Sequence, residues 1–119
     1  MYEYRARLMQ RSNGRHAVYD ADTIWLSVDL GFGINFDLGP CRLYGINAPE
    51  MRGTERHEGV RSRDYVRSLL APHHSFTVRT FKDTKGKYGR YLVEIMLDDE
   101  PRSVNQMLVD EGLAVEADY

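Results

Sequence analysis

The sequence predicts one domain of mixed β and α structure, residues 1–119, built from five strands and two helices. Three observations support this class. The chain has 119 residues, 42% of them apolar and 29% charged, which suits one compact domain and leaves no room for two. Its apolar residues alternate with period two early in the chain and recur at helical spacing later. A single cysteine, Cys41, excludes a disulfide scaffold.

Three strands are expected before the first helix. The clearest covers residues 23–30, where apolar and polar residues alternate as on a half-buried strand; its apolar members are Ile24, Leu26, Val28 and Leu30. Residues 5–10 are expected to form a strand before it, with Ser12-Asn13-Gly14 as turn material. A third strand is expected over residues 41–46, after a break at Gly39-Pro40.

Two helices and two further strands complete the domain. A helix is expected within residues 55–71, because apolar and small residues recur there at helical spacing: Ser62, Tyr65, Val66, Leu69 and Leu70. Strands are expected at residues 75–80 and 91–97, joined by a polar loop over residues 82–89. A short second helix is expected after Ser103, which with Gln106 matches a capping box, and it should end at Gly112.

Five strands, with one helix between the third and fourth and a short helix after the fifth, follow the element order of the OB-fold. That fold is a five-stranded Greek-key β-barrel that often binds nucleic acid. Because one fold serves many functions, the function has to be argued from the site.

The formal net charge of −2 hides an uneven distribution. Residues 42–90 contain eleven Lys or Arg against five Asp or Glu, a balance of +6. Residues 94–119 contain eight acidic residues against one basic residue, a balance of −7. Such a split fits either two solvated faces of opposite sign or a cationic groove for a polyanion.

The sequence also indicates where the protein acts. It has no run of eighteen apolar residues that would span a membrane, and its opening residues lack the apolar stretch of a secretion signal. We therefore expect a cytoplasmic protein, although a trimmed mature domain would have the same sequence. No feature indicates an oligomer, and a monomer is expected.

Three polar clusters stand out along the chain. They are Asp20-Ala21-Asp22-Thr23, then Arg42 followed by Asn47-Ala48-Pro49-Glu50, and Lys87-Tyr88-Gly89-Arg90. Taken singly, the first cluster fits an Asx turn, the second a solvated strand end and the third a mobile hairpin loop. A stripe of Arg56, Arg63 and Arg67 on the long helix fits either solvated helix surface or a surface that steers a phosphate backbone.

Taken together and in this order, the clusters resemble the thermonuclease family, the staphylococcal-nuclease-like OB-fold domains. The family's Asp-Gly-Asp-Thr is similar to residues 20–23, and its Arg followed by Asp-x-Pro-Glu is similar to Arg42 and residues 47–50. Its Lys-Tyr-Gly-Arg is unchanged at residues 87–90, and Val104-Asn105 with Gly112-Leu113-Ala114 is similar as well. The resemblance covers residues 6–117.

The resemblance implies a calcium-dependent endonuclease that hydrolyses DNA and RNA with little base preference and leaves 3′-phosphate ends by breaking the P–O5′ bond. It implies that Arg42 and Arg90 grip the phosphate and that Glu50 orients or deprotonates the attacking water. Lys87 and Tyr88 match family residues that hold the terminal phosphate and nucleotide. The implied calcium ligands are Asp22, Asn47 and the backbone carbonyl of Ala48.

Two departures from the family pattern matter. Asn47 stands where the family has a carboxylate, so one negative charge is missing and weaker calcium binding is expected. The resemblance also implies a third, C-terminal helix in the family, which residues 1–119 are expected to lack.

The alternative function is a non-catalytic OB-fold module that binds nucleic acid or protein. The presence of Arg42, Glu50 and Arg90 argues against it. Cys41 is expected to be a small buried hydrophobe and not a nucleophile.

Overall fold

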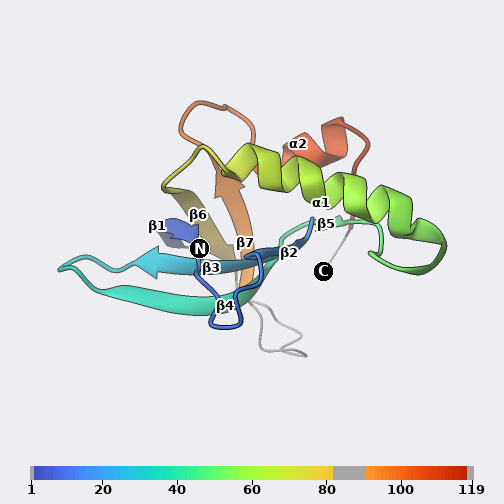
Figure 1. The fold of residues 1–119 in the computed structure, drawn as a ribbon. Helices are drawn as coiled ribbons and strands as arrows, with labels where there is room; N and C mark the ends of the chain where they lie inside the picture. The colour runs from blue at the N-terminus through green and yellow to red at the C-terminus, as the bar shows by residue number, and fades with distance from the viewer. Residues whose placement is uncertain (1, 82–90, 118–119) are drawn as a thin grey trace.

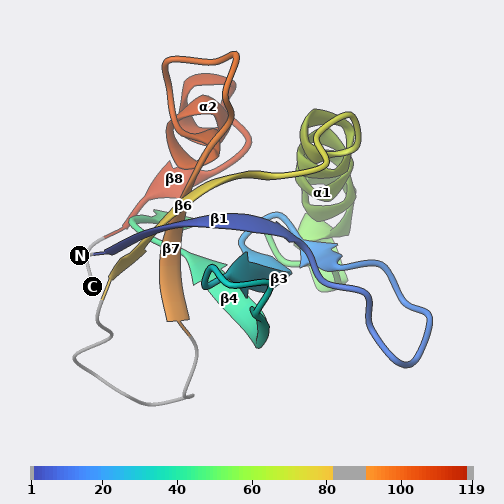
Figure 2. The same ribbon diagram turned by 90° about the vertical axis from the view of Figure 1, so that its left-hand side faces the viewer.

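The computed structural model describes residues 2–81 and 91–117, which form a sheet covered on one side by two helices (Figures 1 and 2). The first half contains β1 (Tyr2–Leu8), β2 (Val18–Asp20), β3 (Thr23–Asp29), β4 (Asn35–Leu43) and β5 (Ile46–Asn47). The second half contains the 3-10 helix η1 (Gly53–Glu55), α1 (Arg56–Leu70), β6 (Phe76–Phe81), β7 (Tyr91–Met96), α2 (Val104–Asp110) and β8 (Val115–Glu116). The predicted class, mixed β with α, is confirmed.

The strands of the main sheet pair in the order β1-β6-β7-β4-β3-β2, and β1 also pairs with β3. Following the pairings from β1 through β6, β7, β4 and β3 therefore leads back to β1. We call these five strands the strand ring. β4 and β7 are parallel, and the other pairs are antiparallel. Helix α1 lies between the third and fourth strands of this ring in chain order, as predicted, and α2 follows the fifth.

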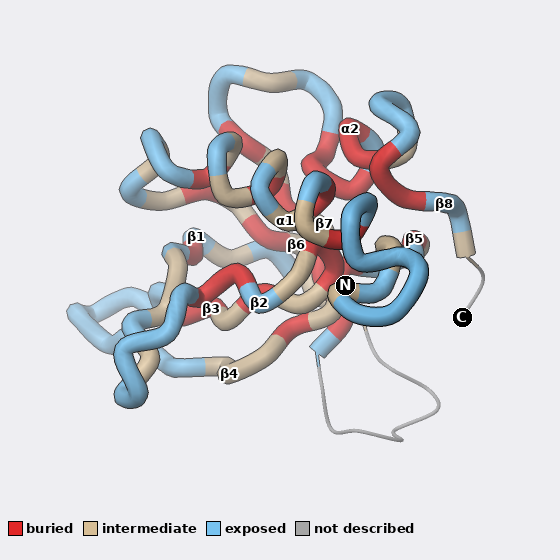
Figure 3. The backbone as a smooth tube through the Cα atoms, turned by 45° about the vertical axis from the view of Figure 1, so that its right-hand side comes forward, coloured by how far each residue is buried: buried red, intermediate tan, exposed pale blue. Residues whose placement is uncertain are grey.

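The core lies between the sheet and the two helices (Figure 3). Its largest fully buried side chains come from every layer, and they include Ile24, Leu26, Leu43, Val66, Leu70, Phe76, Val78, Ile95 and Leu108. Buried Asn105 of α2 connects the layers: its side chain donates to the carbonyls of Tyr44 and Val93 at 2.9 and 3.1 Å and accepts from the Ile95 amide at 3.2 Å. These bonds fix the chain that leaves β4 toward β5.

The predicted bounds of the first two strands differ from the observed ones. The first strand spans Tyr2–Leu8 and not residues 5–10, because its register is set by two neighbours: Tyr2 to Ala6 pair with β6, and Arg5 to Leu8 pair with β3. Leu30 was expected on the buried side of the second strand, but β3 ends at Asp29 and Leu30 is exposed where the β3–β4 hairpin turns.

Gly39-Pro40 is not a break, which corrects the predicted third strand. β4 runs through both residues, and Gly39 adopts φ +77° where the pairing with β3 shifts register between Leu26 and Ser27. Such a bulge uses glycine's access to positive φ. Pairing of β4 with β7 begins only at Cys41, so Pro40 lies where its missing N–H costs no bond to that strand.

Both helices are confirmed near their predicted bounds. In α1, Ser62, Val66 and Leu70 are buried, as the spacing predicts. In α2, Ser103 caps the helix by accepting from the Gln106 amide at 3.0 Å. The Gln106 side chain donates to Asp110 at 2.7 Å, so the reciprocal half of the predicted capping box is not made. Gly112 follows α2 with φ +72°, as a C-terminal stop requires.

Candidate active site

Four short segments between residues 20 and 55 line one hollow of about 440 Å³. They are the end of β2 with the turn into β3, the end of β4, the chain from β5 onward, and η1. The lining residues are Asp20, Asp22, Thr23, Arg42, Asn47, Ala48, Pro49, Glu50 and Glu55. Among the predicted site residues, the structure thus brings together Asp22, Arg42, Asn47, Ala48 and Glu50.

Arg42 is held in place by groups from the β2–β3 turn and from β5. Its Nη1 lies 3.1 Å from Asp22 Oδ2, and its Nη2 donates to the Ile46 carbonyl at 3.3 Å and to the Asn47 side-chain oxygen. The side chain of Arg42 is 19% exposed and that of Asp22 is 11% exposed, so the ion pair is largely shielded from water. A charge pair of this kind in low dielectric is stronger than one on the surface. The guanidinium is therefore positioned before any ligand binds.

The two carboxylates around Ala21 have different surroundings. Asp20 Oδ1 accepts from the Asp22 amide at 3.1 Å, which is the Asx turn that the sequence suggests. Asp22 Oδ2 also accepts from the Ala48 amide at 3.0 Å and so connects the β2–β3 turn to the segment after β5. Burial, together with the neighbouring Asp22 carboxylate, raises the pKa of Asp20 to about 7. Asp20 was not among the predicted site residues, although the paired spacing of the two aspartates was a usable signal.

Glu50 is positioned by close contact between its backbone and α1. Gly59 is buried on that helix, and a Cβ placed on it would lie 2.2 Å from the Glu50 carbonyl oxygen and 2.8 Å from its carbonyl carbon. Only glycine permits this approach. Gly59 was not among the predicted site residues, although a glycine inside an otherwise good helix was an available signal. Glu55 of η1, which brings a further carboxylate to the hollow, was not among them either.

The oxygen atoms that line the hollow are of the type that a hard cation such as calcium binds. Asp22 offers a carboxylate, Asn47 an amide oxygen and Ala48 a carbonyl, and calcium takes such oxygen ligands. Across residues 2–81 and 91–117, however, no three His, Cys, Asp or Glu side chains gather closely enough to hold a metal ion. A calcium ion here would therefore depend in part on neutral oxygens, in keeping with the asparagine at position 47.

Several residues discussed from the sequence lie outside the hollow or outside the described residues. Lys87, Tyr88 and Arg90 fall within residues 82–90, which the structure does not describe, so their assignments stay predictions. Cys41 is fully buried on β4, and burial raises the pKa of its thiol to about 12. It is therefore a core side chain, as predicted, and not part of the site.

Comparison with known families decides the relationship. The family model described as staphylococcal nuclease homologue matches residues 40–119, about two-thirds of the chain. The chain belongs to this family. The match includes the end of β4 and the segment with Asn47 and Glu50, and so covers most of the hollow described above.

A curated relative supports the family and extends it toward the N-terminus. Endonuclease YhcR of Bacillus subtilis (strain 168) is 28% identical over 105 residues, which cover 82% of this chain and 8% of that protein. This staphylococcal nuclease homologue thus spans a small part of the length of the relative it matches. No described helix is both long and apolar enough to cross a membrane.

Proposed function

We propose that this staphylococcal nuclease homologue is a calcium-dependent phosphodiesterase that cuts DNA and RNA internally with little sequence preference. The observation that carries the proposal is the convergence of Arg42, Asp22 and Glu50, from separate segments, on one hollow. Membership of the family and the similarity to an endonuclease support a nuclease.

The charge of the substrate explains the placement of Arg42. A phosphodiester is an anion that repels an incoming hydroxide, and its transition state carries more charge on the phosphoryl oxygens. Arg42 is oriented by Asp22 and the Ile46 carbonyl, so its position in the hollow is fixed before a phosphate binds. A planar guanidinium can contact two phosphate oxygens at once, which a lysine ammonium does less well.

Glu50 is the group proposed to act on water. Its carboxylate belongs to the same hollow as Arg42, and the contact with Gly59 fixes its backbone. Glu50 would orient a water molecule and accept its proton as the water oxygen attacks phosphorus in line. The P–O5′ bond then breaks, the departing O5′ takes up a proton, and the products carry a 3′-phosphate and a 5′-hydroxyl.

The proposed calcium ligands are Asp22, Asn47 and the Ala48 carbonyl, and when bound the ion adds positive charge beside a phosphate oxygen. The neutral Asn47 lowers the negative charge of this set. We therefore infer that the protein needs more calcium than a relative with a carboxylate at that position. Arg90 is proposed as the second guanidinium at the phosphate, with Lys87 and Tyr88 holding the nucleotide.

We also propose that the strand ring is the Greek-key barrel of the OB-fold. The cycle of pairings through β1, β6, β7, β4 and β3 supports it, as does the place of α1 between the third and fourth ring strands. The hollow lies where β3 begins and β4 ends, two strands that pair at Thr23 and Arg42.

The function is tested by incubating the purified chain with plasmid DNA and with RNA, in calcium and in chelator. We expect degradation of both substrates in calcium and none in chelator. Glu50→Gln should abolish cleavage because the amide cannot accept the proton, whereas Glu58→Gln, an exposed position on α1, should not.

The rival function is a non-catalytic module that binds nucleic acid. Tight binding of the wild-type chain to DNA or RNA without cleavage at any calcium concentration would favour that module. Cleavage that survives Glu50→Gln would instead keep a nuclease but remove Glu50 from its mechanism.

A further inference from the structure

The hollow lined by Asp22, Arg42 and Glu50 is called the catalytic hollow below. A second hollow, of about 410 Å³, lies next to it and is lined mainly by basic side chains. The loop between β1 and β2 contributes three of them, and α1 contributes two. The residues that line this arginine hollow are Arg11, Arg15, His16, Tyr19, Met51, Arg63 and Arg67. The predicted stripe on α1 is thereby divided, because Arg63 and Arg67 face this hollow while Arg56 donates to the Met51 carbonyl at 3.3 Å.

The positive charge of the arginine hollow is poorly balanced by the protein itself. Among the described residues that line it there is no Asp or Glu. Arg63 pairs at 3.0 Å with Asp64, a neighbour whose side chain is mostly exposed, and such pairs contribute little. Arg67 donates through Nε and Nη2 to the Val18 carbonyl, which carries no net charge. Burial and the charge of Arg63 lower the pKa of Arg67, as expected where like charges are held together.

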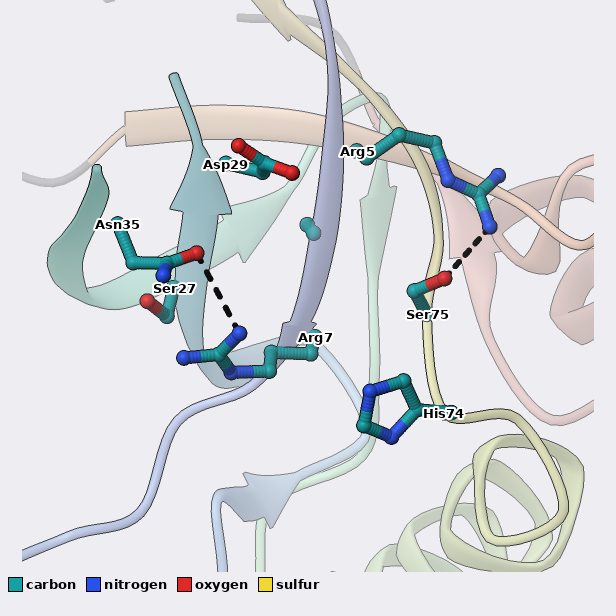
Figure 4. A pocket seen from close by; sticks show the side chains of 8 residues that line it. Arg5, Arg7, Ser27, Asp29, Asn35, His74 and Ser75 are labelled. Atoms are coloured by element: carbon teal, nitrogen blue, oxygen red, sulfur yellow. Dashed lines mark hydrogen bonds between the residues drawn. The ribbon is translucent and has the colours of Figure 1, made fainter. Parts of the chain in front are cut away.

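The arginines of another hollow show the contrast (Figure 4). There Arg5 lies 2.8 Å from Asp98 and donates to Ser75 at 2.7 Å, and Arg7 donates to the Asn35 side chain at 3.3 Å. Those guanidiniums are occupied by partners within the protein, and Asp29 also lines the hollow. In the arginine hollow, Arg11 also has neutral partners, since it donates to the His16 carbonyl at 3.3 Å and lies 4.1 Å from the centre of the Trp25 ring. The difference is therefore one of charge, because no carboxylate in the described lining offsets the four guanidiniums.

The arginine hollow and the catalytic hollow adjoin at two points of the chain. Tyr19 lines the arginine hollow and the next residue, Asp20, lines the catalytic one. In the same way, Glu50 lines the catalytic hollow and the next residue, Met51, lines the arginine hollow. Consecutive Cα atoms lie about 3.8 Å apart, so the linings of the two hollows are one residue apart at both points. Tyr19 is 54% exposed at this junction and offers a face on which a base can stack.

We propose that the arginine hollow binds backbone phosphates of a single polynucleotide strand, beyond the phosphodiester that is cut. The inference rests on the proposed function, since it extends the substrate path of the same site. Guanidiniums bind phosphate oxygens in pairs, and each phosphate that they neutralise releases counterions and adds affinity that falls with salt. The protein should therefore prefer strands long enough to fill both hollows over dinucleotides, which fill only the catalytic one.

The test uses paired variants that remove equal charge. Arg15→Gln/Arg63→Gln removes two cations from the arginine hollow. Arg61→Gln/Arg79→Gln removes two from elsewhere, because Arg61 lies on α1 and Arg79 on β6, outside the lining. Binding is measured in the Glu50→Gln background by fluorescence anisotropy, with single-stranded oligonucleotides of two to sixteen nucleotides at several salt concentrations.

We expect the Arg15→Gln/Arg63→Gln pair to bind strands of eight nucleotides or more about tenfold more weakly at low salt. The slope of log affinity against log salt should fall in magnitude by about 1.4, because each phosphate of a single strand that the protein neutralises contributes about 0.7. Dinucleotide binding should change less than about twofold, and the control pair should lose much less affinity for long strands.

Equal losses in both pairs, or an equal loss for dinucleotides and long strands, would overturn the inference. A competition experiment gives a further test. If polyglutamate displaces a bound long strand as effectively as an oligonucleotide of equal charge does, the inference is overturned in favour of an acidic protein partner. If the length dependence is as expected but the wild-type chain cuts no substrate, the proposed function fails while the strand-binding inference stands.

Discussion

Asn47 stands where the family resemblance implies a carboxylate. Its side-chain oxygen accepts from Arg42 and lines the hollow, so it lies where a ligand to calcium is proposed. A carboxylate there would add a negative charge to a set that depends on neutral oxygens. Charge count is one of the properties that tune calcium affinity.

The substitution Asn47→Asp should therefore lower the calcium concentration that gives half-maximal cleavage, by on the order of tenfold. The measurement is a calcium titration of plasmid cleavage by wild type and variant. Asn35→Asp, on an exposed part of β4, is a control that adds the same charge away from the hollow. An unchanged calcium requirement in Asn47→Asp would show that position 47 does not bind the ion.

Cys41 gives a prediction that depends on pH. An exposed thiol ionises near pH 8.5 and then reacts with iodoacetamide as the thiolate. Burial raises the pKa of Cys41 to about 12, so the native thiol should stay protonated and react far more slowly than glutathione from pH 7 to pH 10. In denaturant the same thiol should react at the glutathione rate. An alkylation midpoint near pH 8.5 in the native protein would contradict the burial of Cys41.

At the scale of elements, the contact of α1 with the segment after β5 sets the position of the Glu50 backbone in the catalytic hollow. Gly59 allows this contact, since any side chain there would collide with the backbone of Glu50. In an exposed helix interior, alanine would be favoured over glycine by roughly 1 kcal/mol. Here the collision reverses that preference.

Gly59→Ala should therefore destabilise the protein by about 1–3 kcal/mol, and it should slow cleavage by roughly a hundredfold by moving Glu50. Thermal unfolding and single-turnover cleavage measure the two effects. Ser68→Ala, at an exposed position of the same helix, is the control and should leave both nearly unchanged. A Gly59→Ala variant that is more stable than wild type and fully active would show that the helix does not position Glu50.

Elements with a strong local pattern could be predicted, and those defined by distant partners could not. The alternation around Ile24 and the spacing in α1 indicated a strand and a helix close to their observed bounds. β2, β5 and β8 are two or three residues long and form because each pairs with a distant or neighbouring strand, so they leave little trace in the local sequence. Gly39-Pro40 was misjudged for a related reason, because a bulge is defined by the register of the partner strand.

The same distinction holds for the site. Asp22, Arg42 and Glu50 were predicted because they belong to short strings with a family resemblance, and all three line one hollow. Gly59 and Glu55 were not found, because their place at the site depends on how α1 and η1 fold back on the strands.

Over the whole molecule, the fold places the arginine hollow and the hollow lined by Arg42 and Glu50 on neighbouring segments. The ring of strands brings the β2–β3 turn and the end of β4 to one side, and α1 adds cations beside them. The β3–β4 hairpin projects away from the helices, as Figure 1 shows. A chain with a net charge of −2 can in this way present a local cationic path to a polyanion.

The most direct test of the proposed chemistry is the single-turnover rate at which Arg42→Lys cuts an end-labelled single-stranded oligonucleotide in saturating calcium. The lysine keeps the charge but loses the planar fork, so the rate should fall by on the order of a hundred- to a thousand-fold. Arg56→Lys, on α1 and outside the hollow, should keep nearly the wild-type rate. A decrease of less than about fivefold in a folded Arg42→Lys variant would contradict the claim that this guanidinium binds the phosphate being cut.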